Sequence, residues 1–289
     1  MVADEIDAKA DLKGNPGDLS IVNIAAYQFV SLSDLENIRD GLLKKAELQG
    51  IAGTILLSEE GINLFIAGEA ESIDDFMAEL IDGLSISNLA IKRSVSRNQP
   101  FRRMVVQIRS EIITFGVEGV DPQHDPAPKI SPLELKQWLD AGHPVRLLDT
   151  RNEFEVRFGS FQNAETIGIE RFRDFPEAAR KLPDEWRKVP VVTFCTGGIR
   201  CEKAAPYLRN LGFQNVYQLD GGILAYFEEC GGVHWDGDCF VFDERIAIGP
   251  DLLESGVQQC VVCQGPIPPG GPDQTIRRCA NCQSGADDH

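Results

Sequence analysis

The hydrophobic positions in the first part of the chain alternate between strand-like and helix-like spacing. Four apolar runs have the length and composition of strands, and they cover residues 20–29, 51–57, 62–66 and 105–115. Between them, apolar residues recur at helical spacing in two segments, one with Ser33 as its expected N-cap and one that starts at Ser72. The order β-α-β-β-α-β predicts a ferredoxin-like unit, which we place at residues 19–118.

The pattern changes after the first unit. Short apolar strands are expected at 145–148, 189–194 and 216–219, and amphipathic helices near 132–141 and 201–211. Strands that alternate with helices in this way predict a parallel α/β sheet, here over residues 131–232. Prolines among polar residues indicate a linker at 119–130, and residues 233–289 form a small C-terminal extension. Residues 1–18, which are polar and acidic, are expected to be a disordered leader.

Composition and charge narrow the classes of function. The chain has 289 residues, a formal net charge of −17 and no apolar run near the roughly 18 residues that a membrane span needs. That charge disfavours binding of nucleic acid over the whole surface, so such a contact must use a local basic patch. The eight cysteines are clustered, which favours thiol chemistry and metal binding in a cytoplasmic protein over a disulfide framework.

One short segment carries the clearest chemical signal, because it places a cysteine in a glycine-containing turn between a strand and a helix. Cys195 follows a buried apolar strand, and the helix is expected from about residue 201. The adjacent Gly197 and Gly198 let successive backbone N–H groups point at one centre. Those donors, the positive end of the helix dipole and the charge of Arg200 all favour a thiolate. Cys195 is therefore predicted to be a nucleophile with a depressed pKa.

The spacing within this turn separates two kinds of chemistry. Cysteine-dependent phosphatases place five residues between the cysteine and the arginine, which makes a loop wide enough for phosphate. Here four residues intervene, namely Thr196, Gly197, Gly198 and Ile199. The smaller ring suits a single sulfur atom, and its N–H donors are expected to stabilise the terminal sulfur of a Cys195 persulfide.

Three motifs resemble the opening, active-site and closing motifs of rhodanese domains, and they are Leu148 to Glu155, the Cys195 loop, and Leu219 to Ile223. Asp149 and Arg151 are similar to the structural Asp-x-Arg of that family. We expect them to form a salt bridge that ties the first strand to the active-site loop. Two positions depart from single-domain sulfurtransferases: Gly159-Ser160-Phe161 replaces the usual Gly-His-Ile, and Cys201 replaces the usual serine.

Most of the chain resembles the bacterial tRNA uridine hydroxylase family. The resemblance rests on four segments, which are Glu60 to Asn63, Phe172 to Pro176, Cys195 to Lys203 and Phe240 to Arg245. That family joins an acylphosphatase-like N-terminal domain to a rhodanese domain. The resemblance implies oxygen-dependent 5-hydroxylation of the wobble uridine of tRNA, with molecular oxygen as co-substrate and Cys195 as catalytic thiol. No site for an organic cofactor is readable in the sequence.

Cys201 has two interpretations. In the first it resolves a Cys195 persulfide by forming a disulfide, and in the second it caps the start of the helix. The choice depends on whether the two sulfur atoms can reach each other across the turn. We favour the first interpretation and group Cys201 with Cys195 and Arg200 as candidate catalytic residues.

A basic stretch occupies residues 91–110, which contain six cations and no acid. Five of these cations are predicted RNA-binding residues: Lys92, Arg93, Arg97, Arg102 and Arg103. Phe101 lies among them and offers a surface on which a base can stack. The alternative is a solvated strand and loop face. The family resemblance favours the surface that faces RNA.

Two Cys-x-x-Cys pairs lie near the end of the chain. Cys260 and Cys263 form the first pair, Cys279 and Cys282 form the second, and 15 residues separate the pairs. Four thiolates with this spacing are typical of a structural zinc site, so we predict one here. The alternative is a loose tail with reduced thiols.

Two other functions stay open beside the tRNA hydroxylase. One is a sulfurtransferase that takes sulfur from a small donor such as thiosulfate and passes it to a thiol acceptor. The other is a zinc-containing RNA-binding scaffold with a vestigial rhodanese domain. The intact Cys195 counts against the scaffold, because inactive rhodanese-like modules commonly lose this cysteine.

Overall fold

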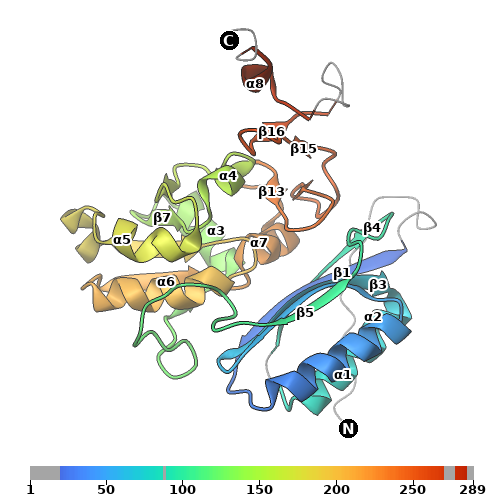
Figure 1. Cartoon of the computed structure of the whole chain (residues 1–289). Coiled ribbons are helices and arrows are strands. Elements are labelled where there is room, and N and C mark those ends of the chain that lie inside the picture. Colours follow the sequence, from blue (N-terminus) through green and yellow to red (C-terminus); the bar gives the residue numbers. More distant parts are fainter. Residues whose placement is uncertain (1–19, 87–88, 270–276, 285–289) are drawn as a thin grey trace.

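The computed structural model of the chain describes residues 20–86, 89–269 and 277–284 (Figure 1). The predicted leader lies outside the described residues. Two separate five-stranded sheets, each with its own helices, form the body of the molecule. A segment without a large sheet follows the second unit and is drawn in orange to red in Figure 1. In the part of the chain that the structure describes, no helix has the length and apolarity needed to cross a membrane.

The first unit contains β1 (Ile21–Phe29), α1 (Leu35–Leu48), β2 (Ala52–Ser58), β3 (Gly61–Glu69), α2 (Ala70–Gly83), β4 (Ala90–Ser96) and β5 (Met104–Ile108). The strand order is β4-β1-β3-β2-β5, with antiparallel pairs except for the parallel pair of β2 and β5. Both helices lie on one face of this sheet (Figure 1), and Ile24 and Phe76 are among the residues buried between them. The predicted ferredoxin-like order is present, with one strand added.

The extra strand corrects the sequence prediction. The fourth strand of the ferredoxin-like order is β4, which the sequence suggested only as a basic stretch. Its side chains are partly or fully exposed up to Val95 because it is an edge strand, so it has no continuous apolar run. The strand expected over 105–115 is the shorter β5. The first helix begins at Leu35 behind Asp34, whose backbone is left-handed, and not behind Ser33.

The second unit contains β6 (Lys129–Ile130), α3 (Pro132–Asp140), β7 (Arg146–Asp149), α4 (Glu153–Val156), β8 (Gly159–Phe161), β9 (Glu165–Thr166), η1 (Phe172–Asp174), α5 (Phe175–Ala179), η2 (Asp184–Lys188), β10 (Pro190–Phe194), α6 (Ile199–Asn210), β11 (Asn215–Leu219) and α7 (Gly222–Cys230). The order β6-β11-β10-β7-β9 has only parallel pairs, which confirms the predicted sheet. Along β10, Val191 packs with α5 and α6, whereas Val192 packs with α3 and α7. Both faces of the sheet are therefore covered.

The remaining described residues form five short strands and one short helix after the second unit. These elements are β12 (Trp235–Gly237), β13 (Cys239–Phe240), β14 (Ala247–Ile248), β15 (Gln258–Gln259), β16 (Pro266–Ile267) and α8 (Ala280–Ser284). β12 pairs with β8, and the Trp235 ring packs edge-on against Phe161 and Phe227. The segment is thus attached to the second unit through a buried aromatic cluster.

Candidate functional site

The predicted thiol loop joins β10 to α6. The Sγ atom of Cys195 accepts a hydrogen bond from the backbone N–H of Gly198 at 3.2 Å, and the N–H of Arg200 also donates to it. Gly198 precedes the first residue of α6 and has a φ of 98°, which a side chain would make unfavourable. The Cys195 side chain is only 1% exposed. The sulfur is therefore held by two backbone N–H donors beneath the surface.

The charge state of Cys195 follows from these contacts. Burial acts to raise the pKa of this thiol, but it is outweighed by a hydrogen bond from Cys201, by the charge of Arg200 and by the two N–H donors, and the pKa is lowered to about 6. Burial and the neighbouring Cys195 thiolate raise the pKa of Cys201 well above its usual range. At neutral pH the pair consists of a Cys195 thiolate that accepts a hydrogen bond from a Cys201 thiol. The Cys201 side chain hydrogen-bonds to Cys195, and its sulfur also lies 3.8 Å from the Thr150 hydroxyl oxygen.

We expect the rate of alkylation of Cys195 by iodoacetamide to rise with pH through a midpoint near 6 and then to level off. A thiol whose pKa is lowered reaches its full thiolate population at lower pH than a free cysteine near 9. Because the sulfur is buried, the midpoint and not the absolute rate reports the pKa. In Cys201→Ala the midpoint should move upward, since the S–H donor is lost. Peptide mass spectrometry of pH-jump samples measures both midpoints. A parental midpoint near 9 would contradict the assigned thiolate.

Arg200 has a partner that the sequence did not reveal. Its guanidinium forms two hydrogen bonds of 2.7 Å with the Glu155 carboxylate of α4, and both side chains are buried. The Glu155 carboxylate also accepts the backbone N–H of Asn152. The arginine thus contributes a positive charge near Cys195 and, at the same time, fastens α4 to the active-site loop.

Asp149 and Arg151 form the expected salt bridge at 2.6 Å, and both side chains are fully buried. Arg151 also donates to the Gly159 carbonyl of β8 at 2.7 Å. The pair therefore joins β7 to β8 and makes no direct bond to the thiol loop. The residue between them makes that connection, because the backbone N–H and Oγ1 of Thr150 both donate to the Phe194 carbonyl at 3.0 Å.

The closing motif supports the loop from its other side. The backbone N–H groups of Ile223 and Leu224, at the start of α7, donate to the carbonyls of Cys195 and Thr196 at 3.0 and 3.1 Å. A side chain at Gly222 would place its Cβ 2.4 Å from the Cys195 carbonyl oxygen. Glycine is therefore required at this position for α7 to approach the loop.

The helix that follows the thiol loop also contacts the first unit. Tyr27 of β1 donates a hydrogen bond from its hydroxyl to Glu202 at 3.0 Å, and the buried Lys203 forms ion pairs with Glu60 and Glu111. Sequence reasoning did not assign roles to these residues, although Glu60, Glu202 and Lys203 lie in the motifs of the family resemblance. Motifs from both halves of the chain thus meet beside Cys195.

The predicted RNA-binding cations do not form one compact cluster. Lys92 and Arg93 lie on β4, at one edge of the first sheet, and the chain from residue 97 to 103 crosses the ends of the strands toward β5 at the opposite edge. Arg93 pairs with Asp74 at 2.6 Å. The side chain of Arg102 is 87% exposed and pairs with Glu244 at 2.6 Å. These cations therefore form a broad surface that passes from one edge of the sheet to the other.

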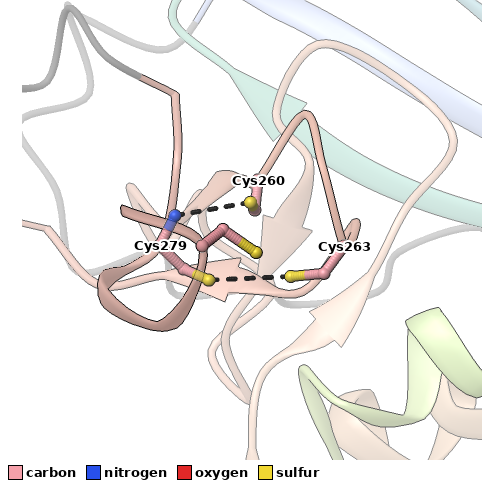
Figure 2. Close-up of side chains that lie close together, drawn as sticks. Cys260, Cys263 and Cys279 are labelled. Carbon is pink, nitrogen blue, oxygen red and sulfur yellow. Dashed lines mark hydrogen bonds between the residues drawn. The ribbon is translucent and has the colours of Figure 1, made fainter. Parts of the chain in front are cut away.

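The four cysteines of the terminal pairs converge. Figure 2 shows Cys260 and Cys263 from one turn facing Cys279 from the other, and the Sγ atoms of Cys263 and Cys279 are 3.6 Å apart. With Cys282, the four sulfur atoms all lie within 4.8 Å of one another. Tetrahedral zinc with bonds of about 2.3 Å needs sulfur atoms roughly 3.8 Å apart, so the donor set and its geometry fit that ion.

Comparison with known proteins assigns a family to each of the two units and to the whole chain. Residues 21–112 match the family described as UPF0176 acylphosphatase like domain, and residues 131–229 match the rhodanese-like domain. The tRNA uridine(34) hydroxylase of Cupriavidus taiwanensis is 48% identical over 93% of this chain and 99% of its own. That of Ralstonia nicotianae is 45% identical, also over 93% of this chain and 99% of its own. The expected relationship is confirmed: this chain belongs to the tRNA uridine(34) hydroxylase family.

Proposed function

We propose that this protein hydroxylates C5 of the wobble uridine of tRNA, with Cys195 as the catalytic thiol. The observation that carries the proposal is the 45–49% identity to tRNA uridine(34) hydroxylases over most of the chain. The site supports the proposal because the loop, α4 and α7 together position and stabilise the Cys195 thiolate. Because the substrate is a tRNA, we place the reaction in the cytoplasm.

The reaction consumes molecular oxygen. Conversion of C5–H to C5–OH inserts one oxygen atom and takes two electrons from the base. Dioxygen supplies that atom, and two electrons and two protons from an external reductant convert the other oxygen atom to water. Within the chain, Cys195 provides the reactive sulfur, Cys201 holds a proton next to it, and the Gly198 and Arg200 N–H groups stabilise negative charge on it.

Nucleoside mass spectrometry of tRNA tests the proposal. Deletion of the gene should remove 5-hydroxyuridine derivatives from position 34, and the cloned gene should restore them. The purified full-length protein should also form 5-hydroxyuridine when tRNA, oxygen and a reductant are supplied. Unchanged levels of these nucleosides in the deletion strain under every growth condition would overturn the proposal.

Three of the exposed arginines should contribute to tRNA binding. The triple change of Arg97, Arg102 and Arg103 to alanine removes up to three phosphate contacts. The slope of log affinity against log salt concentration should therefore become shallower by about 2–3. A filter-binding titration with tRNA at several salt concentrations measures this slope.

A control variant with the same change in net charge separates a contact from a general charge effect. Arg180, Lys181 and Lys188 are exposed cations on the α5 side of the second unit. Their replacement by alanine should leave the salt slope near the parental value. If the salt slope becomes shallower by the same amount in both triple variants, the basic stretch is a solvated face.

We also propose that Cys260, Cys263, Cys279 and Cys282 hold one structural zinc ion. Besides the converging sulfur atoms, the Cys279 N–H donates to the Sγ of Cys260 at 3.3 Å, as expected of a thiolate ligand in a tight turn. Zinc here would fix the two turns to each other. The nearby Arg157, which donates to the Cys263 carbonyl at 3.1 Å, fastens the first turn to α4.

Elemental analysis of protein purified under reducing conditions without added metal should give about one zinc per chain. In Cys260→Ser the zinc content should fall severalfold, because one of four thiolates is lost. Cys230→Ser serves as the matched control, since Cys230 is far from these turns in sequence and partly exposed. A zinc content near zero in the parental protein would contradict the site.

A second candidate function is transfer of sulfur from a small donor. It is favoured by the loop, in which four residues separate Cys195 from Arg200 and two backbone N–H groups donate to one sulfur atom. The Cys195 thiolate would attack the outer sulfur of thiosulfate, form a persulfide and release sulfite. A gain of one sulfur atom on the Cys195 peptide, together with unchanged tRNA in the deletion strain, would favour this function.

A further inference from the structure

A narrow cavity lies where three parts of the chain that are distant in sequence meet. One wall is the face of the first sheet that α1 and α2 leave uncovered, and Asn23 and Phe65 line it. The segment from Val241 to Leu252 supplies residues of the opposite wall, and Thr196 and Leu224 also line the cavity. Thr196 directly follows Cys195. The cavity therefore contacts the thiol loop at Thr196, while Cys195 itself is not among its lining residues.

Aromatic rings line this cavity from both sides. Phe65 and Phe101 belong to the first unit, and Phe242 belongs to the C-terminal segment. Phe242 is 46% exposed, the only aromatic side chain among the large exposed apolar residues in the described part of the chain. Its ring centroid lies 6.4 Å from that of Phe65. An exposed ring at a cavity provides a surface on which an unpaired base can stack.

The polar groups of the cavity are fixed in place. Arg245 is held by Asp243 at 2.9 and 2.6 Å and donates to the Ser94 hydroxyl of β4 at 2.9 Å. The buried Asn23 donates to the Ser96 hydroxyl at 3.1 Å. Carboxylate, amide and hydroxyl groups retain further donors or acceptors beyond these bonds. They can therefore recognise the polar edge of a base without rearrangement.

One cation at the cavity, Lys92, is placed to contact a phosphate. Lys92 lines the cavity together with Glu228, whereas Arg93 is paired with Asp74 and Arg245 with Asp243. Lys92 also lies close to the start of α7, where its Nζ would be 2.4 Å from a Cβ added at Gly221. A cation beside the N-terminus of a helix is a suitable neighbour for a phosphate.

We infer that the rim of this cavity binds one unpaired pyrimidine nucleotide of the RNA, with its base against the exposed ring of Phe242 and its phosphate beside Lys92. The interior of the cavity, about 30 Å³, is smaller than a base, so the base stacks at the rim on the exposed ring of Phe242. The position of Thr196 places that base next to the Cys195 loop. The inference rests on the proposed function, because it identifies the nucleotide with the uridine that is to be hydroxylated.

Photocrosslinking tests the location of the bound nucleotide. An anticodon stem-loop RNA with 5-bromouridine at position 34 is irradiated with the full-length protein, and crosslinked peptides are mapped by mass spectrometry. Crosslinks should fall within residues 94–103 or 240–245. The same label placed in the stem is the control and should give at least fivefold fewer crosslinks in these two segments. Crosslinks from position 34 that map only to other segments would overturn the inference.

A pair of variants tests the stacking surface. Phe242→Ala should weaken binding of the stem-loop RNA roughly 5- to 150-fold, since one base–aromatic stack is lost. Phe242→Tyr keeps the ring and should bind within about twofold of the parental protein. Thermal unfolding of both variants shows that the chain is folded, as expected for a half-exposed side chain. Parental affinity of a folded Phe242→Ala protein would overturn the inference.

These outcomes are distinct from failure of the proposed function. If the parental protein hydroxylates uridine but crosslinks map elsewhere, the function stands and the cavity is wrongly assigned. If the label crosslinks to the cavity but no 5-hydroxyuridine forms in any reaction mixture or strain, the binding site stands and the proposed reaction does not.

Discussion

Replacement of Cys195 by serine is expected to reduce tRNA hydroxylation by more than about 1,000-fold while tRNA binding stays near the parental value. A serine hydroxyl is almost the same size as a thiol but stays protonated at neutral pH. The N–H donors of Gly198 and Arg200 would then face a neutral oxygen in place of a thiolate. Since Cys195 is 1% exposed, its replacement removes little of the surface that tRNA contacts.

The measurement is single-turnover formation of 5-hydroxyuridine in tRNA, with affinity determined separately by filter binding. Cys230→Ser is the matched control, because Cys230 lies at the end of α7 outside the thiol loop, and its activity should be parental. Equal activity of Cys195→Ser and the parental protein would exclude a catalytic thiol at this position.

The second large effect is expected at Glu155. Its carboxylate is fully buried and neutralises the Arg200 guanidinium through two hydrogen bonds of 2.7 Å. Glu155→Gln removes the carboxylate that pairs with this buried guanidinium and leaves only the more distant charges of Cys195 and Asp149. We expect the free energy of unfolding to fall by about 3–5 kcal/mol. Urea unfolding followed by circular dichroism measures the loss.

A double-mutant cycle identifies the cause. Glu155→Leu and Arg200→Met each leave one charge of the pair buried without its partner, whereas the double variant carries neither of these two charges, so its loss of stability should be smaller than the sum of the two single losses. In the folded Arg200→Met protein the alkylation midpoint of Cys195 should move upward, because a positive charge near the thiolate is absent. Strictly additive losses would contradict the buried ion pair.

The features that could be predicted from the sequence are those whose parts are adjacent in the chain. The turn that contains Cys195 spans only a few residues, so its glycines, its helix start and its charge could be recognised directly. The cysteine pairs at 260–263 and 279–282 have a spacing set by the geometry of one ion. The alternation of short strands and helices in the second unit likewise reflects a sheet that is covered on both faces.

Other features depend on contacts between distant residues and could not be predicted. Arg200 finds its counter-ion 45 residues earlier, and Tyr27 reaches Glu202 across 175 residues. Nothing in the local pattern around either partner specifies the other. β4 escaped notice for a different reason, because an edge strand that is half solvated carries no apolar run.

The burial of Cys195 has a consequence for the survival of the protein under oxidative stress. A thiolate with a pKa near 6 is the form of cysteine that peroxides and disulfides attack most readily. Such attack also requires access, and a side chain that is 1% exposed is shielded from bulky oxidants such as glutathione disulfide. Nucleophilicity and vulnerability are thereby separated: the sulfur keeps its reactivity for a small reagent or a base guided into the site, while the thiols of the cellular redox buffer remain outside.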